Sequence, residues 1–82
     1  MQTNAETFKT ILANSYAKLF ETPEYALAAS RYSPEALAEK MTAGLIAGSA
    51  NKDGAGVRIT CKHLGIKPTY KAIREYLTAG AA

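Results

Sequence analysis

Residues 56–77 read GVRITCKHLGIKPTYKAIREYL and carry the most specific pattern in the chain. Apolar side chains precede Gly65 and recur after it at spacings of three and four, which predicts two short helices joined by a tight turn. Gly65 can take the left-handed conformation that ends a helix, and Ile66 can fold back onto the last turn. Pro68 suits the first position of the next helix because it has no backbone N–H to lose. The positions expected to point inward are Val57, Ile59, Cys61, Leu64, Tyr70, Ile73, Tyr76 and Leu77.

Positive charge is concentrated in the same part of the chain. Residues 51–82 contain six basic and two acidic side chains, a net charge of +4, whereas residues 1–50 contain four basic and five acidic ones, a net charge of −1. The net charge of +3 is small, but such segregation is what a directional surface for a polyanion needs. A basic helical hairpin is typical of proteins that bind nucleic acids. The basic residues are Lys52, Arg58, Lys62, Lys67, Lys71 and Arg74.

The remaining sequence predicts further helices and no sheet. Alanine is abundant and runs of β-branched residues are missing, so we expect an all-α bundle of four to five helices in a single domain, residues 1–82. Ser33-Pro34-Glu35 is a strong helix start, and Asn4 and Thr22 are candidate N-caps for two earlier helices. The helices are predicted at about residues 5–20, 23–31, 34–47, 55–64 and 68–78.

Residues 49–56, SANKDGAG, form the clearest break between predicted helices. Their turn-forming residues predict a flexible loop, which is either a linker or a contact loop such as a mobile wing. A phosphate-cradling loop is the less favoured alternative, because the GK[ST] ending of a P-loop is absent. Asp53 is a candidate cap for the helix that follows.

The sequence contains no catalytic or metal-binding pattern. Cys61 is the only cysteine, which excludes an intramolecular disulfide and fits a reducing compartment. His63 is the only histidine, and one Cys with one His is insufficient for a metal site. No signal peptide and no apolar run of membrane-spanning length is visible. We therefore expect a soluble cytoplasmic protein that is not an enzyme, has no cofactor and has no membrane partner.

Residues 59–66, Ile-Thr-Cys-Lys-His-Leu-Gly-Ile, resemble the first helix and turn of the helix-turn-helix superfamily of DNA-binding domains. Cys61, Leu64, Gly65 and Ile66 match the small, apolar, turn and apolar positions of that pattern. The superfamily places inward apolar residues six and nine positions after the glycine, whereas Tyr70 and Ile73 stand one position earlier. Either the turn is shorter, with the helix beginning at Pro68, or the second helix is rotated by about 100°. The shorter turn is the preferred interpretation.

The resemblance implies that the last helix enters the major groove of duplex DNA. Lys71 and Arg74 would then contact base edges, while Thr69 would cap the helix and contact phosphate. The resulting nucleic-acid-binding residues are Lys52, Arg58, Lys62, Lys67, Thr69, Lys71 and Arg74.

Several functions remain open on sequence alone. Duplex DNA is the favoured partner, and small size suggests a regulator or accessory factor of the phage or plasmid type. Single strands or RNA, bound by stacking on Tyr70 or Tyr32, form a weaker possibility. The alternative is a protein-interaction module that forms a homodimer or docks on a partner through the small-residue face of residues 34–48.

Overall fold

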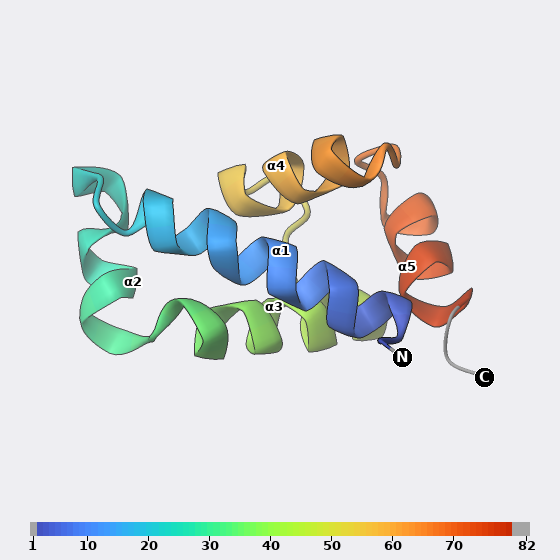
Figure 1. The fold of residues 1–82 in the computed structure, drawn as a ribbon, viewed down its shortest axis with the longest axis horizontal. Coiled ribbons are helices and arrows are strands. Elements are labelled where there is room, and N and C mark those ends of the chain that lie inside the picture. The colour runs from blue at the N-terminus through green and yellow to red at the C-terminus, as the bar shows by residue number, and fades with distance from the viewer. Residues whose placement is uncertain (1, 80–82) are drawn as a thin grey trace.

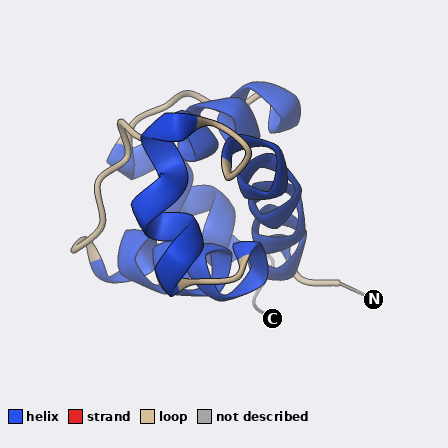
Figure 2. Ribbon diagram, turned by 90° about the vertical axis from the view of Figure 1, so that its left-hand side faces the viewer, coloured by secondary structure: helices blue, strands red, loops and turns tan. Residues whose placement is uncertain are grey.

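The computed structural model describes residues 2–79, and all regular secondary structure in that range is helical (Figure 1; Figure 2). This confirms the predicted all-α bundle. The helix at residues 34–47 and the helix at residues 55–64 have the predicted bounds. The predicted helix at 23–31 is instead a turn of 3₁₀-helix followed by a short α-helix. The elements are α1 (Asn4–Leu19), η1 (Pro23–Tyr25), α2 (Ala26–Arg31), α3 (Pro34–Ala47), α4 (Ala55–Leu64) and α5 (Tyr70–Ala79).

Helix α1 is the element on which the others pack. It contacts α3, α4 and α5, and α3 also contacts α5. In Figure 1, α3 runs below α1, α4 lies above it, and α5 closes the end of the bundle where α1 begins. At that end the Asn4 side-chain amide donates a hydrogen bond of 3.0 Å to the carbonyl of Tyr76. Helices α4 and α5 are therefore held in place chiefly by α1 and α3.

The core follows the helical spacing of the apolar residues. In α4, the buried residues Val57, Thr60 and Cys61 stand three and four positions apart, so they share one face. The inward placement predicted for Ile59 is wrong: the side chain is 47% exposed, because a position two residues from both Val57 and Cys61 lies on the opposite side of a helix. The core residues are Phe8, Leu12, Tyr16, Ala38, Leu45, Val57, Cys61, Ile73 and Leu77.

Three buried hydroxyl groups are accommodated within this core. Thr60 donates to the carbonyl of Gly56 at 2.8 Å, and Thr42 donates to that of Ala38 at 2.7 Å. Ser15 donates in the same way to the carbonyl of Ile11 at 3.1 Å. Each hydroxyl uses the carbonyl one turn earlier, so burial leaves no unsatisfied donor. Small polar residues thus occupy helix contacts without disturbing them.

The helix starts agree only in part with the predicted caps. Ser33 accepts from the N–H of Ala36 at 3.0 Å, as predicted. The prediction for Asn4 is wrong, because Thr3 is the N-cap of α1 and forms a capping box with Glu6. Thr22 makes no cap hydrogen bond, because its hydroxyl donates to the carbonyl of Leu19 at 2.6 Å. The cap of α4 is Gly54 rather than Asp53.

Tyr16 packs against Phe20 and Tyr25 and joins this aromatic group to α4. Its ring is 5.9 Å from that of Phe20 and 6.3 Å from that of Tyr25, measured between centroids. Gly56, in the first turn of α4, lies against the same ring: a Cβ at Gly56 would be 2.5 Å from Tyr16 Cε1. Burial, together with a smaller contribution from Tyr25, raises the pKa of Tyr16 to about 12. The first turn of α4 therefore rests directly on a buried, neutral tyrosine.

The pKa of Tyr16 predicts a loss of stability at high pH. Between the ordinary tyrosine pKa of about 10 and the folded-state pKa of about 12, the unfolded chain releases the phenolic proton and the folded chain retains it. The free energy of unfolding should therefore decrease as the pH rises through this interval. Urea unfolding followed by far-UV circular dichroism at pH 9 to 12 measures the decrease. The variant Tyr16→Phe should lose less stability over the same interval, and an equal loss would contradict the assignment to Tyr16.

Candidate nucleic-acid interface

The turn between α4 and α5 is fixed by backbone hydrogen bonds. Gly65 ends α4 in the predicted left-handed conformation, with φ of 71°. The N–H of Ile66 donates to the carbonyl of Cys61 at 3.0 Å, which folds the chain back onto the last turn of the helix. The geometry of the chain leaving α4 is therefore defined by Gly65 and Ile66.

Helix α5 begins later than predicted. Its first residue is Tyr70, and the Thr69 hydroxyl accepts from the N–H of Ala72 at 3.1 Å. Pro68 precedes this cap instead of occupying the first helical position. The shorter turn inferred from the spacing of Tyr70 and Ile73 is thus wrong, because Thr69 supplies the better cap.

Lys52, Asp53 and Arg58 form a charged group where the α3–α4 loop meets α4. The Lys52 ammonium is 2.8 Å from Asp53 Oδ1, and Arg58 Nη2 is 3.9 Å from the same oxygen. The hydrogen bond and charge of Lys52 lower the pKa of Asp53, with a smaller contribution from Arg58. Asn51 shapes the turn by accepting from the N–H of Asp53 at 2.9 Å. Two of the predicted basic residues are therefore brought together by one carboxylate.

Tyr70 connects this charged group to α5. Its hydroxyl accepts from the backbone N–H of Lys52 at 3.4 Å, and the Lys52 ammonium lies 5.6 Å from the centre of its ring. These contacts hold Tyr70 at the surface, 39% exposed, so the prediction that it points inward is wrong. The contact between Lys52 and Tyr70 joins residues 18 positions apart, so the local spacing of apolar residues could not predict it.

Arg58 and Lys62 border a groove beside the turn. They stand four positions apart on α4, and Cys61, Ile66 and Pro68 supply the rest of the lining. The groove has a volume of about 420 Å³. Both cationic side chains belong to exposed residues, so a ligand in this groove meets two positive charges above an apolar floor.

The other predicted residues lie on the turn and on α5. Lys67 is exposed in the turn and Lys71 is exposed in the first turn of α5. Arg74 lies above the end of α3: a Cβ at Gly48, which ends α3 with φ of 80°, would be 2.8 Å from Arg74 Nη2. A cation at the C-terminal end of a helix is stabilised by the helix dipole. Arg74 is therefore placed to support α3 as well as to face solvent.

Most of the basic side chains on α4, the turn and α5 make no ion pair within residues 2–79. Within residues 2–79, both ion pairs involve Asp53, and neither uses Lys62, Lys67 or Lys71. Glu75 is the other acidic residue of the C-terminal part and is exposed on α5. No glutamate of α1 or α3 lies within ion-pair distance of these cations in the described range. Lys62, Lys67 and Lys71 therefore keep an unpaired positive charge within residues 2–79.

Within the described residues, neither metal binding nor membrane insertion is indicated. Over the described range, no three His, Cys, Asp or Glu side chains are grouped so that they could hold a metal ion. Each helix in residues 2–79 is too short or too polar to cross a lipid bilayer. No protein-family model, curated protein or solved structure matches the chain.

Proposed function

We propose that this protein is a small duplex-DNA-binding module that acts in the cytoplasm as a regulator or accessory factor of the phage or plasmid type. The observation that carries the proposal is the group of exposed cations on α4, the turn and α5, with no carboxylate in ion-pair distance of Lys62, Lys67 or Lys71 in the described part of the chain. Phosphate contacts by such cations supply most of the affinity of non-specific binding.

The groove beside the turn suits a sugar-phosphate backbone. Arg58 and Lys62 can each pair with a phosphate, while Ile66 and Pro68 offer an apolar surface to a deoxyribose. Thr69 uses its hydroxyl oxygen as an acceptor in the cap, so its hydroxyl hydrogen can donate to a phosphate. Lys71, one residue into α5, is the candidate for a base edge.

Duplex DNA is a better match than single strands. Stacking platforms for single-stranded nucleic acids require an accessible aromatic face. The rings of Tyr70 and Tyr32 each already carry a lysine ammonium, Lys52 at 5.6 Å and Lys40 at 5.1 Å. Exposed cations on two helices and a turn instead offer contacts to phosphates, which dominate the binding of a duplex.

Binding to a fluorescent random-sequence duplex, followed by anisotropy across a salt series, tests the proposal. Four to six phosphate contacts predict a slope of log K against log salt between about −4 and −5. At a physiological salt concentration of about 150 mM we expect a dissociation constant of about 1–100 µM, and tighter binding at 50 mM. A single-stranded oligonucleotide of equal length should bind more weakly. No duplex binding at 50 mM salt, or a preference for the single strand, would contradict the proposal.

Protein interaction through α3 is the second candidate function. The outer side of α3 borders a groove of about 460 Å³, lined by Met41, Ala43, Gly44 and Ala47 among others, and Ile46 on the same helix is 40% exposed. A backbone NMR titration with duplex DNA separates the two candidates. Shifts in residues 52–75 support DNA binding, whereas shifts confined to residues 34–48 would point to α3 instead.

A further inference from the structure

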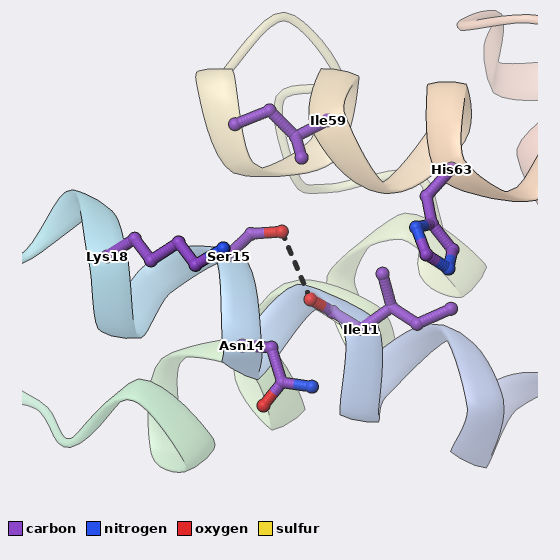
Figure 3. Close-up of a pocket in the computed structure, with 6 residues that line it drawn as sticks. All are labelled: Ile11, Asn14, Ser15, Lys18, Ile59 and His63. Carbon is purple, nitrogen blue, oxygen red and sulfur yellow. Dashed lines mark hydrogen bonds between the residues drawn. The ribbon is translucent and has the colours of Figure 1, made fainter.

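A second groove lies between α1 and α4, on the flank of α4 away from Arg58 and Lys62. Figure 3 shows His63 directed from α4 towards Ile11 on α1, with Ile59 one turn away along α4. The groove has a volume of about 320 Å³. Its apolar part is Ile11 and the 47%-exposed Ile59. Asn14, Ser15, Lys18 and His63 complete the lining, so the groove contains a cation and no carboxylate.

The complementary feature on the same molecule is Leu27. It is the most exposed large apolar side chain among the described residues, at 64%, on a helix that buries no residue of its own. Glu24 and Glu21 are exposed three and six positions before it, and Arg31 follows one turn later, which leaves an acidic excess. Helix α2 makes its main contacts with η1 rather than with α4. Leu27 therefore does not fill the groove of its own chain.

We propose that this groove receives Leu27 from a second copy of the chain, with Glu24 of that copy beside Lys18. This contact removes Leu27 and Ile59 from water and places the acidic Glu24 of one copy beside the basic Lys18 of the other. Arg58 and Lys62 stand on the other flank of α4, so the contact leaves the groove beside the turn open. The dimer does not require DNA, and its test is independent of the proposed function.

The oligomeric state tests the proposal. Sedimentation velocity of the full chain between about 20 and 500 µM, the range expected for a small interface, should show the mass rising from 8.7 kDa towards twice that value. Leu27→Glu and Ile59→Glu should each weaken self-association by at least about tenfold, because each places a carboxylate in the contact. Both residues are exposed, so the far-UV circular dichroism should remain that of the parent chain. Ile46→Glu, which alters an exposed isoleucine on α3, should leave the association unchanged.

Mixing the two variants identifies the contact as Leu27 in the groove. The Leu27→Glu copy keeps an intact groove and the Ile59→Glu copy keeps Leu27, so an equimolar mixture should form a dimer that neither variant forms alone. A parent chain that stays at 8.7 kDa throughout the range would overturn the proposal. So would a mixture that remains monomeric, or a dimer that Ile46→Glu disrupts and Leu27→Glu does not.

Discussion

Replacing Gly56 with alanine is expected to lower the free energy of unfolding by about 2 kcal/mol and the melting temperature by about 10 °C. The added Cβ would lie 2.5 Å from Tyr16 Cε1, which is closer than carbon atoms can approach, and 3.0 Å from Cζ. The Tyr16 ring is 4% exposed and packs against Phe20 and Tyr25, so it cannot move without disturbing the aromatic group. The higher helix propensity of alanine offsets only part of this cost.

The chain provides a matched control for Gly56→Ala. A Cβ at Gly54, two residues earlier, would have no heavy atom within 4 Å, so Gly54→Ala should cost only the preference of the N-cap position for glycine over alanine, about 0.5–1 kcal/mol. Thermal unfolding of both variants measures the difference. In a Tyr16→Leu background the ring is gone, and Gly56→Ala should then cost much less. An unchanged cost in that background would show that the ring is not the cause.

The fold was largely predictable because local signals dominate a small helical protein. Ser33-Pro34 sets the start of α3 and Gly65 the end of α4, and both act within one turn of the chain. The errors arose where two local signals competed. Thr3 and Asn4 can both cap a helix, and only the position of Glu6 relative to Thr3 favours the observed start. Thr69 competes with Pro68 in the same way at the start of α5.

The candidate site was less predictable because its geometry depends on contacts distant in sequence. Charge counts identify the basic residues, but they do not show that Asp53 holds Lys52 and Arg58 together. They also give no indication that Arg74 lies over Gly48 at the end of α3. The inward placement expected for Ile59 came from an alternation of apolar residues at 57, 59 and 61, which fits a strand and not a helix. Its exposure leaves an apolar side chain at the surface, in the lining of the groove between α1 and α4.

The contacts of Arg74 also decide which cations make the better test of DNA binding. Changing Arg74 would remove a charge from the end of α3 and confuse lost stability with lost binding. Lys52 is unsuitable for a similar reason, because its side chain is 27% exposed and covers the Tyr70 ring. Lys62 and Lys71 are exposed and make no ion pair within residues 2–79. A change in DNA binding when Lys62 and Lys71 are replaced should therefore reflect the lost surface charge and not a loss of stability.

Reversing both charges, Lys62→Glu with Lys71→Glu, is expected to weaken duplex binding about a hundredfold at 100 mM salt. Loss of two phosphate contacts removes about 1.8 from the magnitude of the salt slope, and the new carboxylates repel the phosphates in addition. The double variant Lys9→Glu with Arg31→Glu has the same change in net charge but alters α1 and α2. Because charges beyond about 10 Å are screened at this salt concentration, it should bind within about threefold of the parent chain. Anisotropy titrations of both variants make the comparison, and equal weakening would mean that net charge, rather than a localised surface on α4 and α5, attracts the DNA.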